Sequence, residues 1–330
     1  MKELVSVIIP TYKRSECLIR AINSVLIQTY TNVEIIVVDD NDENSTYRKD
    51  NKKKLENYIN NNKIIYITHK KNMNGANARN TGIKAAKGVY ITFLDDDDYF
   101  LPDRIEKLVK ILKTHKNYGG AYSSVIFEDK EGIITNLFHA DNKKELQKIV
   151  LSGKGFFGTG SNMFFRKSVL DKVGMFDGNF KRHQDLEYMV RFLEESNIIN
   201  LDEFLVVKSN YDGINVPNYQ VLFSSKERFL KKFENIINKY DADSRREIYV
   251  KHLYNLYSNA PYKEKKRLLN VLKSYGEKKY MVYSKNLRLY IKNSLKKIKI
   301  VRVINMIHIK GKKYQILLSN LKSSLEEMKS

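Results

Sequence analysis

Four consecutive aspartates, Asp95 to Asp98, directly follow a strand-like segment at 88–93. Adjacent carboxylates repel one another unless a cation lies among them, and hard oxygen ligands of this kind suit Mg²⁺ or Mn²⁺. Because such ions usually bind together with phosphate groups, the run predicts a metal-diphosphate site at the end of a strand. The alternative is a solvated acidic loop before the helix that Pro102 starts, since Asp and Pro are both favoured there.

Strand-like and helix-like segments alternate along the first two thirds of the chain. The expected strands are apolar runs and the expected helices have apolar residues at helical spacing. The strands are expected at 4–9, 34–38, 64–68, 88–93, 121–127 and 162–166, and the helices include 15–28, 75–87, 143–151 and 181–197. This order predicts an α/β fold, with a Rossmann-like, mostly parallel sheet flanked by helices.

Polar residues follow three of these strands. Thr11 and Tyr12 come after the first, Asp39 and Asp40 after the second, and the four aspartates after the fourth. In doubly wound sheets ligands bind beyond the carboxyl ends of the strands, so we expect the three segments to meet at one crevice. This convergence favours the metal site over the solvated loop.

The two parts of the chain differ in charge. Residues 1–223 hold 32 Lys and Arg against 29 Asp and Glu, whereas residues 224–330 hold 27 against 9. The second part reads as basic, Tyr-rich helices at 226–240, 245–257, 263–275 and 285–299. We therefore expect a catalytic domain at 1–223 and a basic, mainly helical region at 224–330.

Cysteine usage and hydropathy bear on location. Cys17 is the single cysteine of the sequence, which excludes an intramolecular disulfide and fits a reducing, cytoplasmic setting. The start of the chain has no apolar stretch of the signal-peptide kind. Residues 298–309 are apolar-rich but short and interrupted by charges, so membrane contact is expected to be peripheral.

Five sequence pieces in register give the chain a family resemblance. They are residues 5–12 (VSVIIPTY), 36–40 (IVVDD), 78–82 (ARNTG), 88–98 (GVYITFLDDDD) and 173–177 (VGMFD). Over about residues 3–212 the chain resembles a glycosyltransferase of family 2 with the GT-A fold. The resemblance implies inverting transfer of a sugar from a nucleotide sugar, usually a UDP-sugar, to a hydroxyl of a growing glycan.

The resemblance also assigns roles to individual residues. The nucleotide-sugar site is expected to comprise Pro10, Thr11, Tyr12, Asp40, Arg79, Asp95 and Asp96. Asp40 and Tyr12 match the positions that hold uracil, Asp95 the position that reaches the ribose, and Asp97 the ligand of Mn²⁺ or Mg²⁺. A register shift within the run leaves Asp96 and Asp98 ambiguous, and Asp39 is expected to be structural.

Two roles have structural alternatives. Asp185 falls at the late acidic motif and is the candidate general base, the alternative being a helix N-terminal cap. Arg79 is expected at the diphosphate, the alternative being a salt bridge to Asp97 or Asp98. Many relatives carry a metal-binding His after the last strand. Here the stretch at 208–213 lacks it, and the alternatives for that ligand are Asp212 and water. His183 reads as a surface residue.

The basic tail lies outside the resemblance. Residues 278–313 place apolar residues beside lysines and arginines, as an interfacial helix on an anionic membrane requires. Its alternatives are packing on the catalytic domain and an oligomer contact. With lipid-linked glycan acceptors common in the family, we expect a peripheral enzyme on the inner face of a bacterial cell membrane, in capsule or lipopolysaccharide synthesis.

Two other functions compete with sugar transfer. A nucleotidyltransferase acting on sugar phosphates also joins a Rossmann-like sheet to acid-bound Mg²⁺, but its basic triphosphate loop is echoed only by residues 11–14. A basic nucleic-acid-binding protein would suit the charge. No recognised binding motif supports that function, so nucleic acid is not an expected partner.

Overall fold

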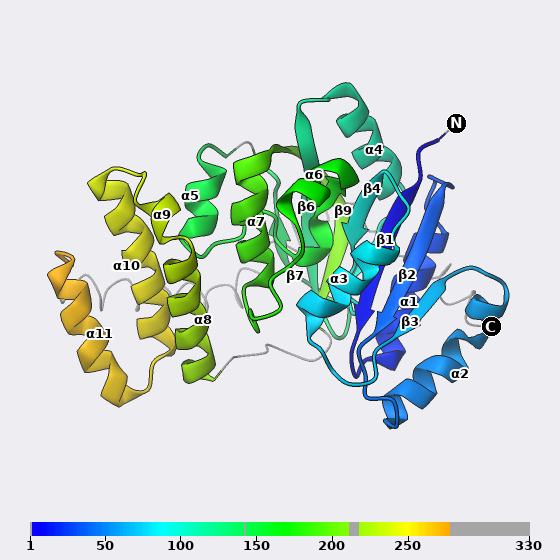
Figure 1. The fold of residues 1–330 in the computed structure, drawn as a ribbon, viewed down its shortest axis with the longest axis horizontal. Coiled ribbons are helices and arrows are strands. Elements are labelled where there is room, and N and C mark those ends of the chain that lie inside the picture. The colour runs from blue at the N-terminus through cyan, green and yellow to red at the C-terminus, as the bar shows by residue number, and fades with distance from the viewer. Residues whose placement is uncertain (1, 142, 211–217, 278–330) are drawn as a thin grey trace. The chain divides into compact units, whose positions relative to one another are not determined.

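The computed structural model describes residues 2–141, 143–210 and 218–277. Within these residues the chain forms two compact units. The first, up to residue 143 and from 157 to 210, is an α/β domain, and the second, 144–156 with 218–277, is helical (Figure 1). Segment 144–156 thus groups with the C-terminal helices, and the expected domain boundary at 223 stays a prediction.

The described residues of the first unit form a nine-stranded sheet in the order β3-β2-β1-β4-β8-β6-β9-β5, with β7 also paired to β6. Strands β3, β2, β1 and β4 run parallel, as do β6 and β9, while β8 is antiparallel to both of its neighbours. The strands are β1 Val5–Thr11, β2 Val33–Asp39, β3 Ile65–Thr68, β4 Tyr90–Phe93, β5 Tyr99–Phe100, β6 Tyr118–Asp129, β7 Ile134–Phe138, β8 Phe164–Arg166 and β9 Asn197–Asn210.

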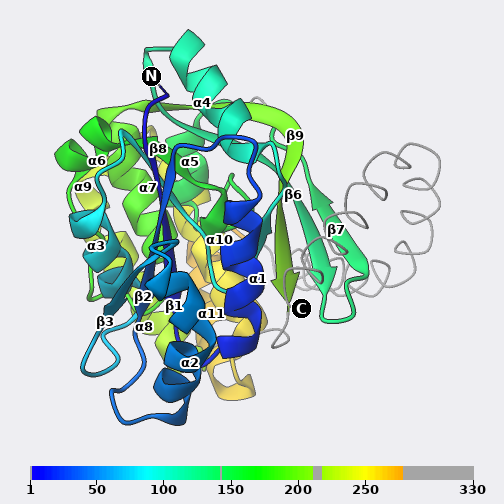
Figure 2. The same ribbon diagram turned by 90° about the vertical axis from the view of Figure 1, so that its right-hand side faces the viewer.

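Helices cover both faces of the parallel part of this sheet. Helix α3 lies on one side of β1 and β2, and α1 and α2 lie on the other (Figure 2). The helices of this unit are α1 Ser15–Leu26, α2 Thr46–Asn60, α3 Gly75–Ala85, α4 Arg104–Thr114, α6 Lys167–Val173 and α7 Gln184–Glu195, with a 3₁₀ turn, η1, at Gly160–Asn162. The expected α/β class, with a largely parallel sheet flanked by helices, is confirmed.

Local chemistry explains where the helices around β1 and β2 begin and how they pack. The side chain of Ser45 accepts a hydrogen bond from the amide of Arg48 and caps α2, and Asn74 caps α3 in the same way. Strands β1 and β2 are apolar and buried over most of their length, as expected for parallel strands covered on both faces. Gly82 faces β1 so closely that a Cβ would lie 2.3 Å from Ile8 Cγ2.

The second unit has its own apolar core. It contains α5 Leu146–Leu151, α8 Tyr219–Lys232, α9 Glu234–Ile237, α10 Ala242–Asn259 and α11 Tyr262–Ser274. Leu222, Leu256, Leu268 and Leu272 are among the buried side chains that pack together in it. The helix expected at 285–299 and the membrane segment expected at 278–313 lie outside the described residues.

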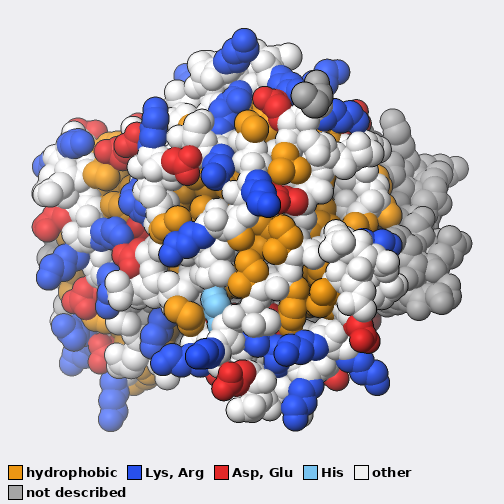
Figure 3. All heavy atoms as spheres, turned by 45° about the vertical axis from the view of Figure 1, so that its right-hand side comes forward, with side chains coloured by type: hydrophobic (Ala, Val, Ile, Leu, Met, Phe, Trp, Pro, Cys, Tyr) orange, Lys and Arg blue, Asp and Glu red, His pale blue; other side chains and the backbone are white. Residues whose placement is uncertain are grey.

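The surface of the described chain mixes apolar and cationic groups. The face drawn in Figure 3 shows hydrophobic side chains among Lys and Arg side chains. The large exposed hydrophobic residues are distributed over different elements, among them Tyr47 on α2, Ile65 on β3 and Met73 before α3. No helix in the described ranges combines the length and apolarity needed to cross a bilayer.

Candidate active site

Thr11 links the ends of three parallel strands. Its carbonyl accepts a hydrogen bond from the amide of Asp40, which follows β2, at 2.9 Å. Its hydroxyl donates to the carboxylate of Asp96, which follows β4, at 2.7 Å. Since β1 lies between β2 and β4 in the sheet, this single residue holds the three polar segments together. The expected convergence of the segments is therefore present in the structure.

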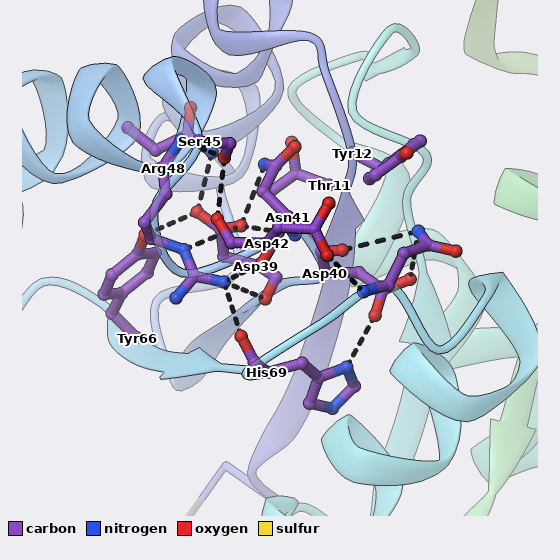
Figure 4. Close-up of polar contacts among 12 residues, drawn as sticks. Thr11, Tyr12, Asp39, Asp40, Asn41, Asp42, Ser45, Arg48, Tyr66 and His69 are labelled. Atoms are coloured by element: carbon purple, nitrogen blue, oxygen red, sulfur yellow. Dashed lines mark hydrogen bonds and ion pairs between the residues drawn. The ribbon is translucent and has the colours of Figure 1, made fainter.

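Asp40 is buried and bonded on both carboxylate oxygens (Figure 4). Oδ1 accepts from Nδ1 of His69 at 2.7 Å and from the amide of Met73 at 2.8 Å, and Oδ2 accepts from Asn72 at 2.9 Å. Because a carboxylate only accepts, Nδ1 of His69 carries a proton, and Nε2 lies 2.9 Å from the Thr81 hydroxyl. Asp40 is thus fixed in one orientation just past the end of β2.

Asp39 points into a closed polar network. Its oxygens accept from the amide and side chain of Asn41, from Asn51 and from the Tyr66 hydroxyl, and the Arg48 guanidinium lies 3.2 Å away. Arg48 in turn donates to three backbone carbonyls (Figure 4). These contacts give Asp39 a structural role, as the sequence indicates.

Replacing Asp39 by alanine is expected to destabilise the protein by about 3–5 kcal/mol, because it leaves the buried Arg48 charge and several donors unpaired. Thermal or urea unfolding followed by circular dichroism measures the change. Glu43→Ala, on the exposed segment before α2, is the control and should shift stability by less than about 0.5 kcal/mol. Equal stability of the two variants would show that the network carries no net free energy.

Asp96 and Asp97 share a cation. The Arg14 guanidinium lies 3.3 Å from Asp96 and 3.0 Å from Asp97. Asp96 also accepts from the Thr11 hydroxyl and, at 3.3 Å, from the amide of Tyr12. Asp96 is therefore directed at the end of β1, whereas the carboxylate of Asp97 forms an ion pair with Arg14.

Asp98 has a different surrounding and is fully buried. Its Oδ2 accepts from the hydroxyls of Ser161 and Thr159 at 2.6 and 3.2 Å, and its Oδ1 accepts from the amide of Ser209 at 3.2 Å. The Lys208 ammonium lies 3.8 Å away. Asp98 thus anchors the acidic loop to η1 and β9.

Asp95 connects the acidic loop to the start of α7. Arg79 donates to Asp95 at 2.6 Å and to Gln184 at 3.2 Å. The salt bridge of Arg79 therefore goes to Asp95, rather than to Asp97 or Asp98. Asp185 follows Gln184 in the first turn of α7 and accepts from the amide of Leu186 at 3.0 Å, while the cap position itself is His183, which has a positive φ of 62°.

The four acids differ in how readily they ionise. Burial, followed by the charge of Asp97, raises the pKa of Asp96 to about 7. Burial likewise raises the pKa of Asp98 to about 7 and, together with the charge of Asp95, raises the pKa of Asp97. Burial opposes ionisation of Asp95 too, but the charges of Arg79 and Lys208 outweigh it and lower its pKa. A cation placed among these groups would favour their ionised forms.

Pro10 and Tyr12 flank Thr11 at the end of β1. Pro10 pairs in register with Val38 of β2. The Tyr12 ring is 39 % exposed and lies under the ammonium of Lys13, which is 5.0 Å from the ring centroid. Figure 4 shows Tyr12 past the end of β1, in the same region as Asp40. An exposed aromatic face at this place suits stacking with a flat heterocycle.

The donor set fits a divalent ion that is carried by phosphates. Among the described residues, no group of three His, Cys, Asp or Glu side chains is arranged to hold a metal by itself. Mg²⁺ sites of nucleotide enzymes commonly use one or two carboxylates and complete the shell with phosphate oxygens and water. Asp97, with Asp95 as its neighbour, would supply the one or two carboxylates of such a site. Asp212 lies outside the described residues.

Arg14 and Lys208 are cations of the site that the sequence reasoning did not assign. Both lower the pKa of acids in the run through their charge. Arg14 could have been assigned from the sequence, because it is close to Thr11 and follows the end of β1. Lys208 is on β9, far along the chain, and only the pairing of β9 with β5 and β6 brings it to the acids.

Comparison with known sequences identifies relatives in several organisms. A glucosyltransferase of Escherichia coli, "UDP-Glc:alpha-D-GlcNAc-diphosphoundecaprenol beta-1,3-glucosyltransferase WfaP", is 38% identical over 136 residues, covering 41% of this chain and 51% of the relative. An uncharacterized glycosyltransferase of Rickettsia typhi is 29% identical over 248 residues, 72% of this chain and 75% of the relative. A Rickettsia felis relative is 49% identical over 109 residues, but these cover 33% of this chain and 17% of that protein. The chain thus spans about half the length of the Escherichia coli relative and less than a fifth of the Rickettsia felis relative.

A solved structure has a similar fold. The mannosyltransferase PcManGT of Pyrobaculum calidifontis, in complex with GDP-Man and Mn²⁺, aligns with a TM-score of 0.51 at 14% identity, covering 91% of this chain and 88% of that one. The sequence pattern of the family described as "Glycosyl transferase family 2" matches residues 6–174, which is half of the chain. The chain therefore belongs to glycosyl transferase family 2.

Proposed function

We propose that the protein is a divalent-metal-dependent, inverting glycosyltransferase that moves a sugar from a UDP-sugar to a hydroxyl of a lipid-linked glycan. The observation that supports this proposal is the bonding of Thr11 to the segments after β2 and β4, because Tyr12, Asp40 and the acid run follow the strand ends that Thr11 links. Family membership and the UDP-Glc donor in the name of the Escherichia coli relative support it.

The nucleotide would lie along the strand ends. Uracil has an N3–H donor and a flat face, which suit the carboxylate of Asp40 and the ring of Tyr12. Oδ2 of Asp40 accepts one hydrogen bond, from Asn72, and a carboxylate oxygen can accept a second. Asp95 is assigned to the ribose hydroxyls and Asp96 to positioning of the strand end, beside Pro10 and Thr11.

The diphosphate would lie over the acid cluster. Asp97 would hold Mn²⁺ or Mg²⁺, and the ion would supply neutralisation of the negative charge on the departing diphosphate. Arg79 donates a hydrogen bond to Asp95 at 2.6 Å, so its guanidinium lies beside the acid cluster. Arg14 and Lys208 add two further positive charges around the acids.

Transfer with inversion requires a base on the face of the sugar opposite the diphosphate. Asp185 is assigned this role: its carboxylate takes the proton of the acceptor hydroxyl while the oxygen bonds to the anomeric carbon and the bond to the diphosphate oxygen breaks. The charge of Arg79 lowers the pKa of Asp185 and the charge of Asp95 raises it, which agrees with a position of Asp185 near the acid cluster. Burial raises the pKa of Asp185, and a more basic carboxylate is a better proton acceptor.

The acceptor and location follow from the relatives and the charge of the chain. The name of the Escherichia coli relative specifies a sugar on diphosphoundecaprenol as acceptor. A lipid-linked acceptor and the basic region after residue 223 together support work at the inner face of the cell membrane, in synthesis of a surface polysaccharide such as capsule or lipopolysaccharide.

The proposal is tested by incubating the protein with a panel of UDP-, GDP- and dTDP-sugars and Mn²⁺, with and without a diphosphoundecaprenol-linked sugar. Release of the nucleoside diphosphate is followed by chromatography, and binding by calorimetry. We expect UDP-sugars to bind and to be turned over, faster with the acceptor present. Absence of both binding and turnover with every donor would contradict the proposal and favour a nucleotidyltransferase.

A further inference from the structure

The helical unit contains a cavity of about 600 Å³ that plays no part in the proposed sugar transfer. It is lined by the segment after α5, by Lys226 of α8, by one face of α10 and by Glu277. Its size is within the range of about 300–1,000 Å³ typical of small-molecule sites. All of the lining residues belong to the second unit, so the cavity is a property of that unit alone.

Lys226 is a buried cation in the wall of this cavity. Its side chain is 2 % exposed, and its ammonium lies 3.4 Å from Nδ1 of His252. Nε2 of His252 lies 2.8 Å from the carbonyl of Leu151, which only accepts, so the ring proton is on Nε2 and Nδ1 is the acceptor. His252 therefore accepts one of the three ammonium protons of Lys226.

Within residues 2–141, 143–210 and 218–277, the charge of Lys226 has no acidic partner. In the described ranges no carboxylate forms an ion pair with it, and burial lowers its pKa to about 8. A buried charge without a partner is costly, and buried charges in proteins are usually paired or held against a bound ion. The structure thus keeps a cation and two unused donors at a cavity of ligand size.

The acids near the cavity are already neutralised by other cations. Glu277 accepts from Arg246 at 2.8 Å and from the Tyr254 hydroxyl at 2.6 Å. Glu247 forms ion pairs with Lys148, at 3.0 Å, and with Lys251. These acids are therefore held by the groups beside them.

The lining has a net charge of +2. It carries four cations and two acids, namely Lys154, Lys226, Arg246 and Lys251 against Glu247 and Glu277. A phosphate monoester has a charge of about −1.5 to −2 near neutral pH and several acceptor oxygens, so it matches both the excess charge and the unused donors. A single carboxylate would leave about one positive charge uncompensated.

We propose that this cavity binds the phosphate group of a small organic phosphate monoester on Lys226, with the organic part along Val250 and the Tyr254 ring. Lys154, exposed at the mouth, adds the second unbalanced charge. Two sources have this chemistry, a soluble sugar phosphate and the phosphate of a lipid chain. The inference does not depend on sugar transfer, because binding is measured without a nucleotide sugar.

The test measures binding of inorganic phosphate, glucose 1-phosphate and dodecyl phosphate to the full chain by calorimetry. We expect at least one organic phosphate to bind more tightly than inorganic phosphate, and the Lys226→Met variant to lose about tenfold or more in affinity, as for a charged hydrogen bond. Lys266→Met, exposed on α11 and away from the cavity, is the matched control and should bind like the wild type. Preference for glucose 1-phosphate or for dodecyl phosphate separates the two sources.

Thermal unfolding gives a second readout. Lys226→Met should raise the midpoint without ligand by about 2–4 °C, since it removes an unpaired buried charge, and should abolish the shift that the phosphate gives to the wild type. If this variant does not fold, protection of Lys226 in the wild type from acetylation by the bound phosphate, followed by mass spectrometry, replaces it. No binding of any of the three phosphates at about 10 mM, or equal binding to wild type and Lys226→Met, would overturn the proposal.

Discussion

Replacing Asp97 by alanine is expected to reduce kcat/KM for sugar transfer by about 10³-fold, because the variant loses the carboxylate assigned to the divalent ion. The fold should survive the change, since Arg14 keeps its contact with Asp96 at 3.3 Å. Calorimetry supplies a readout apart from turnover: UDP should bind the wild type more tightly with Mn²⁺ than without it, and this difference should disappear in Asp97→Ala.

The control for this variant is Asp103→Ala. Asp103 lies just before α4 and forms an exposed ion pair with Lys107, so its loss should change turnover by less than about twofold. If Asp97→Ala retains both its activity and its Mn²⁺-dependent UDP affinity, the metal ligand lies elsewhere. Because Asp98 is held by Ser161, Thr159 and Ser209, it is not an equivalent second choice.

The Asp185→Asn substitution is expected to lower kcat by about 10²- to 10⁴-fold with little effect on the affinity for UDP, because asparagine keeps the shape of the side chain and cannot accept the proton. Glu195→Gln, at the other end of α7, is the matched control and should keep wild-type kcat. Steady-state kinetics and UDP titration separate the two effects. Loss of UDP affinity together with kcat would indicate that Asp185 supports the start of α7 rather than the chemistry.

The pH dependence follows from the same group. Burial raises the pKa of Asp185, although its bond from Leu186 and the charge of Arg79 oppose this rise. A general base works in its deprotonated form, so kcat should fall as the pH falls through this raised pKa. The wild type should show this acidic limb at a higher pH than an ordinary aspartate would give, and the residual activity of Asp185→Asn should lack it.

Much of the fold could be predicted because its parallel strands are covered on both faces. Such strands have apolar runs that stand out from the polar helices, and the runs at 4–9 and 34–38 correspond to β1 and β2 within one or two residues. Strand β9 was not predicted as an element, since Asn200, Asp202 and Glu203 interrupt its apolar pattern. It forms because β6 and β5 pair with it, which is information from distant parts of the chain.

The candidate site could be predicted as a set of residues, but not as a set of contacts. The position of polar residues after strands brings Thr11, Asp40 and the acid run together, because neighbouring parallel strands end at the same edge of the sheet. Which acid meets which partner depends on side-chain directions and on distant segments. Four identical aspartates in a row therefore do not indicate that Asp96 forms an ion pair with Arg14, or that Asp98 accepts a hydrogen bond from Ser161.

The anchoring of Asp98 has a consequence for protein engineering. Because this carboxylate binds hydroxyls from the turn around η1 and an amide of β9, the spacing of the acids is set by three pieces of chain at once. Chimaeras that exchange the segment 157–163 with a relative should therefore keep Thr159 and Ser161, or transplant a matching β9 as well. A donor-specificity graft that ignores this coupling would displace the acids even though none of them had been altered.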